Sequence, residues 1–221
     1  MMAARRISES LRIALLLAAA GGFLDAYTYV LRGGVFANAQ TGNIVLLGIS
    51  LFEANLGAAF RYLIPIAAFA AGIFTTECVR ERFSHFTPLH WRQLILVIEC
   101  AALTAVAFIS EQHNIVANAA VSFVCSLQVE SFRKVHGSPY ATTMCTGNLR
   151  SAAENLFNYM IHKEPENFYA ARNYFIIIGT FVTGAGVGAL AAKICGHGSV
   201  LFAAALLAAA AVIMFKEKET A

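Results

Sequence analysis

The feature that most constrains this chain is an internal duplication, marked by two copies of a Thr-Gly-Asn tripeptide. The first copy is Thr41-Gly42-Asn43 and the second is Thr146-Gly147-Asn148, so a shift of 105 positions superposes them. The same shift carries Asp25 onto Glu130, so that an acidic residue precedes each tripeptide at the same spacing. Each copy also follows an apolar stretch of membrane-helix length. The chain is therefore predicted to be a duplicated unit.

Composition identifies the environment of that unit. The chain is 58% hydrophobic and only 13% charged, whereas a soluble domain carries about a quarter charged residues. Six stretches are long enough to cross a hydrocarbon core of roughly 30 Å. They lie near Ile13–Leu31, Phe60–Val79, Trp91–Ile109, Ile115–Phe132, Asn173–Ala192 and Ser199–Phe215. We predict an all-α membrane protein, one integral domain over residues 1–221, with repeat 1 at about 11–110 and repeat 2 at about 115–216.

The number of spans fixes how the two repeats must be related. Each repeat contains three spans, and because three is odd, the second repeat enters the membrane upside down relative to the first. Six transmembrane helices in two inverted three-helix repeats are an architecture of transporters, which bind substrate near the midplane between the repeats. Each tripeptide is expected to start a short extra helix, with threonine as the N-cap and glycine allowing the sharp entry. This helix could be re-entrant, form the first part of a broken span, or lie on the membrane interface.

Basic residues set the orientation. With the N-terminus inside, 13 Lys and Arg residues lie on the cytoplasmic side and three (Arg32, Arg61 and Lys193) on the other. This bias predicts that both termini are cytoplasmic. The net charge of +3 reflects the same bias, and no basic cluster interleaved with aromatic residues indicates a nucleic-acid partner.

Chemistry-bearing motifs are few. The five cysteines show no CxxC spacing, and the histidines have no partner at ligand spacing, so we predict neither a metal site nor a cofactor. No Ser/His/Asp or HExxH arrangement occurs, so an enzyme is not expected.

The two tripeptides supply the candidate substrate-binding residues: Thr41, Gly42, Asn43, Thr146, Gly147 and Asn148. A helix N-terminus exposes N–H groups and a partial positive charge, so two of them facing each other would suit a polar or anionic solute. The alternative is that both tripeptides merely start two helices.

Acidic residues inside apolar spans are candidates for proton or ion coupling, because an intramembrane carboxylate is costly and usually functional. Asp25, Glu130 and Glu99 are the candidates. Alternatively, Asp25 and Glu130 each cap the short helix that follows, and Glu99 pairs with Arg61 or lines the same cavity.

A run of small residues, Gly184-Ala185-Gly186-Val187-Gly188, makes a GxxxG face in the fifth span. Such a face permits close helix packing, either within the chain or in a homodimer.

The stretch from Gly21-Gly22-Phe23-Leu24-Asp25-Ala26-Tyr27 through Gly34-Val35-Phe36 to Thr41-Gly42-Asn43 resembles the YoaK-like family of small bacterial inner-membrane proteins, a domain family of unknown function. Gln128, Arg133 and the run Ala141–Gly147 look similar too, and Gln128 joins the substrate-binding candidates. The resemblance implies a six-span protein of the bacterial inner membrane. Asn38-Ala39-Gln40 and Glu130 depart from the family pattern, which favours Asp25 over Glu130 for proton coupling.

The leading function is a small secondary transporter or facilitator, with its site between the two helix starts and Asp25 as proton or cation partner. The expected partners are the lipid bilayer and a small-molecule or ion substrate. A passive channel of the same fold is the first alternative. A non-transport scaffold or regulator, which predicts no central polar cavity, is the second.

Overall fold

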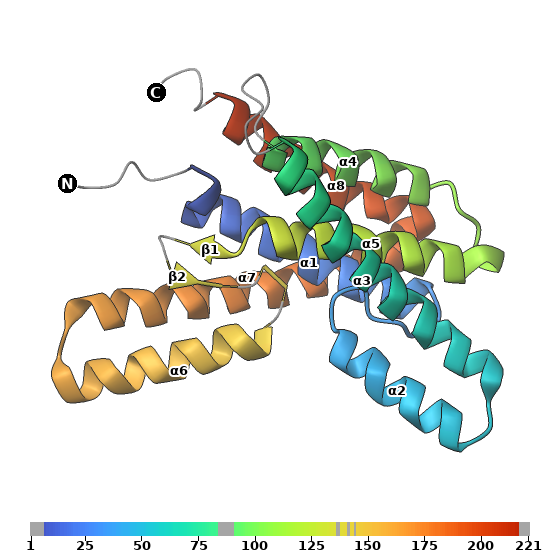
Figure 1. Ribbon diagram of the computed structural model, residues 1–221, viewed down its shortest axis with the longest axis horizontal. Helices are drawn as coiled ribbons and strands as arrows, with labels where there is room; N and C mark the ends of the chain where they lie inside the picture. The colour runs from blue at the N-terminus through green and yellow to red at the C-terminus, as the bar shows by residue number, and fades with distance from the viewer. Residues whose placement is uncertain (1–6, 84–90, 136–137, 141, 144, 217–221) are drawn as a thin grey trace.

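The protein is built almost entirely of helices, as the sequence predicts. The computed structural model describes residues 7–83, 91–135, 138–140, 142–143 and 145–216 (Figure 1). The first half holds η1 (Ile7–Glu9), α1 (Leu11–Leu31), α2 (Gln40–Phe52), α3 (Leu56–Phe83), α4 (Trp91–Val106) and η2 (Glu111–His113). The second holds α5 (Asn114–Ser131), β1 (Lys134–Val135), β2 (Ser138–Pro139), α6 (Cys145–His162), α7 (Pro165–Cys195), η3 (Gly196–Ser199) and α8 (Val200–Lys216). The two short strands pair antiparallel.

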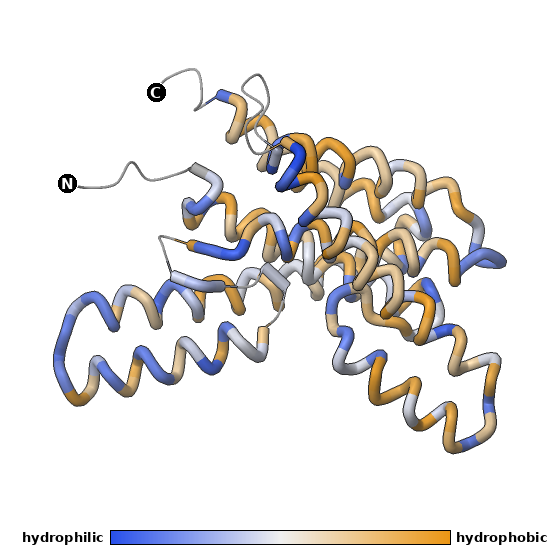
Figure 2. Tube along the Cα trace, in the orientation of Figure 1, coloured by the Kyte–Doolittle hydropathy of each residue, from blue (hydrophilic) through white to orange (hydrophobic). Residues whose placement is uncertain are grey.

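Three helical segments of the described chain are long and apolar enough to cross a membrane. They are Leu11–Leu31, Leu56–Phe83 and the continuous stretch Pro165–Lys216, which contains α7, η3 and α8. Large apolar side chains are also exposed on the surface, including Phe52, Phe74 and Ile194. In Figure 2 the hydrophilic residues gather at the α6–α7 connection, at the end of α3 and near η2, with hydrophobic helix bodies between. These features agree with the prediction of a membrane protein.

The helices form a central body with two projecting arms. α1, α4, α5 and α8 share one apolar core, which includes Leu17, Leu103, Val121 and Leu207. α2 packs against α3 and α6 packs against α7, and these pairs leave the body in different directions (Figure 1). We call them the α2–α3 arm and the α6–α7 arm. The most extensive contact between two helices is that of α1 with α7, and the second most extensive is that of α3 with α5.

Glycines let the helices of these two pairs approach backbone to backbone. A Cβ on Gly184 would lie 2.2 Å from the carbonyl oxygen of Ala19, and one on Gly188 would lie 2.7 Å from that of Phe23. Gly72 of α3 meets the α5 backbone equally closely. The GxxxG face of α7 therefore packs within the chain, against α1.

Candidate functional site

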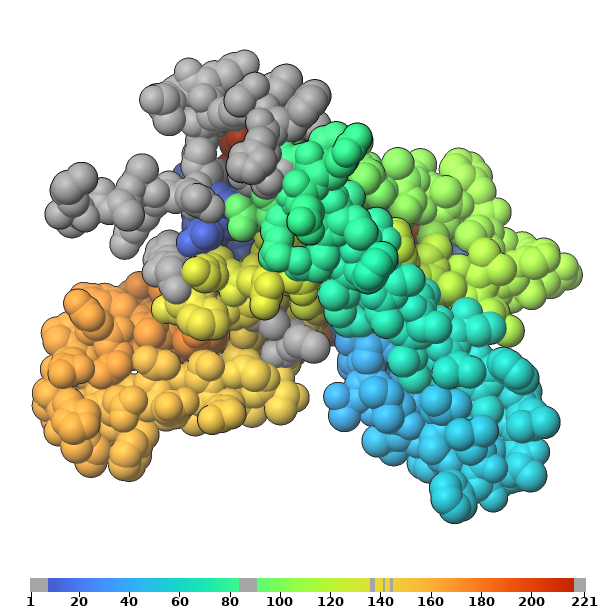
Figure 3. All heavy atoms as spheres, viewed as in Figure 1, coloured from blue at the N-terminus to red at the C-terminus, as the bar shows by residue number. Residues whose placement is uncertain are grey.

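A cavity of about 1040 Å³ lies between the two arms. It is lined by α1, by the start of α2, by the end of α5, by the start of α6 and by α7. Figure 3 shows a hollow between α6 of one arm, in yellow, and α2 of the other arm, in light blue. This volume is at the upper end of the range for small-molecule pockets, about 300–1,000 Å³.

Both Thr-Gly-Asn tripeptides reach this cavity. Thr41 contributes to its wall from the first turn of α2, and Thr146, Gly147 and Asn148 contribute from the first turn of α6. Each helix begins one residue before its threonine. The expectation that threonine is the N-cap is therefore wrong for α2, where Ala39 occupies the cap position without a side-chain hydrogen bond.

The other two residues of the first tripeptide hold the loop ahead of α2. Asn43 is fully buried, and its Oδ1 accepts a hydrogen bond from the Phe36 backbone N–H at 3.1 Å. Its Nδ2 donates to the Phe36 carbonyl at 2.7 Å and to Gln40 Oε1 at 2.9 Å. Gly42 leaves room for the Phe36 ring, which would lie 3.1 Å from a Cβ there. Asn43 and Gly42 thus hold the loop that carries Phe36, which lines the cavity, but neither of the two residues lines the cavity itself.

Asp25 lies on the cavity wall and also organises the loop. Its Oδ1 accepts a hydrogen bond from the Asn38 backbone N–H at 2.7 Å, and the amides of Ala37 and Ala39 interact with the same carboxylate. These residues directly precede α2. Asp25 therefore binds the backbone just ahead of this helix, which is close to the capping role that the sequence offers as the alternative to proton coupling. It remains 7% exposed and faces the cavity from α1.

Glu130 also lines the cavity, from the end of α5. It forms an ion pair with Arg133 at 2.9 Å, and its carboxylate also interacts with Glu77 of α3. Glu77 in turn pairs with Arg80. Among the described residues, Glu130 therefore belongs to a charged cluster and does not cap α6.

Two predicted site residues lie away from the cavity. Glu99 is fully buried in α4, and neither of its carboxylate oxygens has a hydrogen-bond partner among the described residues. It therefore makes no ion pair with Arg61. Gln128 is buried too, and its Nε2 donates to the Leu17 carbonyl at 3.1 Å, which ties α5 to α1.

Aromatic residues that sequence reasoning had not singled out complete the wall. Tyr29 stacks on Phe36 with ring centroids 4.8 Å apart, and Phe181 and Tyr140 face the same space. Burial raises the pKa of the Tyr140 hydroxyl, so the phenol stays protonated. Burial, and then the charge of Asp25, raise the pKa of the Cys145 thiol at the start of α6. No cluster of metal-ligating side chains occurs in the described parts of the chain.

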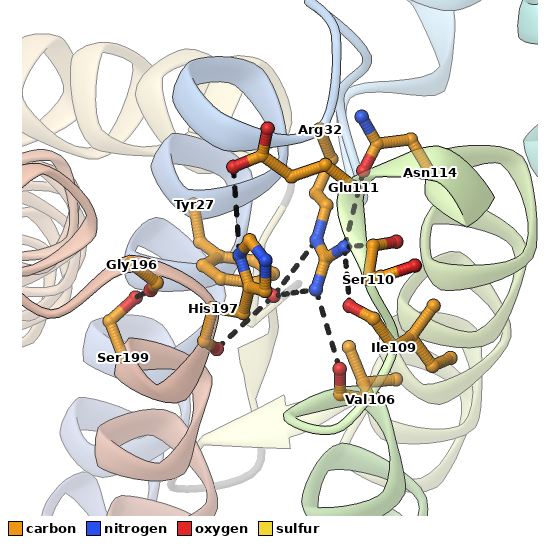
Figure 4. A network of polar contacts seen from close by, with 10 residues as sticks. All are labelled: Tyr27, Arg32, Val106, Ile109, Ser110, Glu111, Asn114, Gly196, His197 and Ser199. Atoms are coloured by element: carbon orange, nitrogen blue, oxygen red, sulfur yellow. Dashed lines mark hydrogen bonds and ion pairs between the residues drawn. The ribbon is translucent and has the colours of Figure 1, made fainter.

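The basic-residue count places Arg32 on the non-cytoplasmic side, just after the first span. The structure buries its side chain fully at the end of α1 (Figure 4). Its guanidinium donates to the Tyr27 hydroxyl at 2.7 and 3.0 Å and to the end of α4 and the residues that follow it. The further acceptors are Asn114 Oδ1 and the backbone oxygens of Val106, Ile109 and Ser110. The network connects α1 to the α4–α5 connection, and two of its members, Arg32 and Asn114, line a separate cavity of about 440 Å³.

In the comparison with known proteins, a family model described as "Protein of unknown function (DUF1275)" matches residues 13–213. No curated protein and no solved structure matches the chain.

Proposed function

Because this chain belongs to the DUF1275 family, whose function is unknown, we propose its activity from the cavity itself. It is a small secondary transporter or facilitator for a small polar or anionic solute, coupled to protons through Asp25. The observation that carries the proposal is that both Thr-Gly-Asn helix starts line one cavity, together with Asp25 and Glu130.

We propose six transmembrane helices in two inverted repeats, α1–α4 and α5–α8. Each half runs a helix, a helix that begins at the tripeptide (α2 of 13 residues, α6 of 18), a long helix and a further helix, so that α1 corresponds to α5 and α3 to α7. Exchanging the halves turns the α1–α7 contact into the α5–α3 contact, and the α1–α8 contact into the α5–α4 contact. A pseudo-two-fold axis accounts for these matched pairs.

The depth in the membrane at which α2 and α6 begin follows from their contacts with one residue of α1. Gly21 is the central residue of α1, a helix of about 30 Å. Asn38, just before α2, donates from Nδ2 to the Gly21 carbonyl at 3.1 Å, and Thr143, just before α6, packs against the same glycine. If α1 spans the membrane, both short helices begin near its midplane. We therefore infer that α2 and α6 are re-entrant, the first of the arrangements considered for them.

The size of the cavity favours a solute carrier over an ion-selective pore. The selectivity filter of a channel replaces the hydration shell of an ion within a narrow constriction. A cavity of about 1040 Å³ is instead large enough for an organic molecule. The scaffold alternative expects no central polar cavity, which disfavours it. We retain the proposals that the chain is no enzyme and lies in the bacterial inner membrane with both termini cytoplasmic. The N-terminal end of α1 and the C-terminal end of α8 lie on the same side in Figure 1, which fits this topology.

The test is solute-dependent proton movement in proteoliposomes that contain a pH-sensitive dye. Asp25→Asn is the informative variant, because an amide oxygen can still accept from the Asn38 N–H while the charge is lost. Glu130→Gln is the matched change at the other acidic residue of the cavity. We expect solute flux in the wild type and loss of the accompanying proton movement in Asp25→Asn. Solute flux that is unchanged and carries no protons in either protein would favour the channel, and no flux of any solute would remove the proposal.

A further inference from the structure

Two residues that line the cavity each have a buried polar atom without a hydrogen-bond partner among the described residues: Asn38 Oδ1 and Thr143 Oγ1. Both side chains are deeply buried, with 2% and 5% of their surface exposed, and both residues line the cavity. An unpaired buried polar group costs about 1–3 kcal/mol, so native proteins rarely leave one without a reason. Here two such atoms belong to residues that line one cavity.

The two residues occupy equivalent places in the duplicated sequence. The shift of 105 positions that superposes the tripeptides also carries Asn38 onto Thr143. Each residue lies three positions before the threonine of its tripeptide and two before the first residue of its short helix. Both halves therefore place a polar side chain at the same point, although the residue types differ.

The fold brings this pair together at Gly21. Asn38 Nδ2 donates to the Gly21 carbonyl, while the Thr143 methyl carbon would lie 2.3 Å from a Cβ on Gly21. The glycine therefore allows both loops to reach the same turn of α1. Its carbonyl also fixes the orientation of the Asn38 amide, because only the NH₂ group can donate to it. The atom left over is Oδ1, which is an acceptor.

We propose that Asn38 and Thr143 form the solute-contacting subsite, and that it takes a solute with N–H or O–H donors, such as an amine, amide or polyol. This inference rests on the proposed transport function and narrows its substrate class. A donor group on the solute supplies the partner that Asn38 Oδ1 lacks, and a hydroxyl such as that of Thr143 accepts a second one. The Asp25 carboxylate beside them adds a further acceptor.

The electrostatics of the site point in the same direction. The start of α2 would attract an anion on its own, but the Asp25 carboxylate already engages the amides of residues 37–39 ahead of that helix. An inorganic anion there would approach a carboxylate and an amide oxygen. A donor group meets no such repulsion from these two oxygens, Arg133 of the same cavity is paired with Glu130, and the stacked Tyr29 and Phe36 rings give the solute an apolar wall.

The experiment measures initial uptake rates of six probes into proteoliposomes. Glycerol, urea and ethanolamine carry donors, while chloride, nitrate and acetate are anionic acceptors. Thr143→Val removes the hydroxyl at nearly constant volume, and Thr143→Ser restores it. Thr142→Val is the control, because Thr142 is equally buried and its hydroxyl is also unpartnered among the described residues, yet it does not line the cavity. Melting temperatures of all variants establish that each is folded.

We expect the wild type to take up at least one donor probe and none of the anions. Thr143→Val should slow that uptake about three- to tenfold, the range for one lost hydrogen bond, while Thr143→Ser and Thr142→Val keep it. Uptake of the anions in place of the donors, or a Thr143→Val rate equal to the wild type, would overturn the subsite and leave transport standing. Absence of uptake for all six probes would remove both the transport proposal and this inference.

Discussion

Replacing Gly184 with alanine tests the packing that positions the α6–α7 arm. The added Cβ would lie 2.2 Å from the Ala19 carbonyl oxygen, about 1.2 Å inside the 3.4 Å at which ordinary contact begins. The obstacle is backbone, so α1 and α7 must separate. Overpacking of this kind costs about 1–3 kcal/mol. Gly186 lies half a turn away on the same helix with nothing within 4 Å, and alanine there should gain up to about 1 kcal/mol of helix propensity.

The two alanine variants should therefore move in opposite directions, with a gap of about 1–4 kcal/mol in unfolding free energy. For a chain of this length, 1 kcal/mol shifts Tm by about 2–4 °C, so the melting temperatures in detergent should differ by about 2–16 °C. Far-ultraviolet circular dichroism on heating provides the assay. Equal Tm values would refute the backbone contact. If Gly184→Ala instead changed the oligomeric state measured by light scattering, the glycine face of α7 would belong to a homodimer interface.

Two other predictions concern the loops and ends of the helices. Arg32→Ala should destabilise the protein by about 3 kcal/mol or more, because several buried acceptors lose a charged donor, whereas the exposed Arg61→Ala on the same cavity should stay within about 0.5 kcal/mol in the same melting assay. Asn43→Ala should lower stability by about 2 kcal/mol through its two bonds to the preceding loop, while Thr41→Val should change solute uptake and leave Tm nearly unaltered. Uptake lost in Asn43→Ala at an unchanged Tm would contradict this division of roles.

Composition predicted the helical class and the membrane character, and the duplication predicted a helix at each tripeptide. Of these two helices, α2 is short, with 13 residues, whereas α6 has 18, as many as α5. The duplication could not predict which residue of each tripeptide faces the cavity. Both helices begin one residue before the threonine, yet Gly147 and Asn148 line the cavity while Asn43 turns to the loop. The facing of each residue therefore depends on how each helix packs against the rest of the molecule, which the tripeptide does not encode.

Asn38 and Thr143 escaped sequence reasoning for a different reason. They lie outside the tripeptides and differ in type, so similarity between the halves does not reveal them, although the shift of 105 does pair them. Their importance depends on which polar atoms lack partners, and that requires three-dimensional contacts. The burial of Arg32 likewise depends on the end of α4, more than 70 residues further along the chain.

The packing divides the molecule in a way that bears on how the cavity could open. α6 and α7 are joined to α1, and α2 and α3 are joined to α5, whereas contact between α1 and α5 is slight. α4 and α8 pack on each other and on both groups, and the cavity lies between the groups. Rocking one group against the other would change access to the cavity and preserve the close glycine contacts within each, as alternating access requires. Such a carrier exchanges labelled solute against an outward gradient of unlabelled solute, so counterflow into preloaded proteoliposomes is expected. Rapid flux without counterflow would instead fit a passage that stays open through the cavity, and the division into two groups would then serve folding alone.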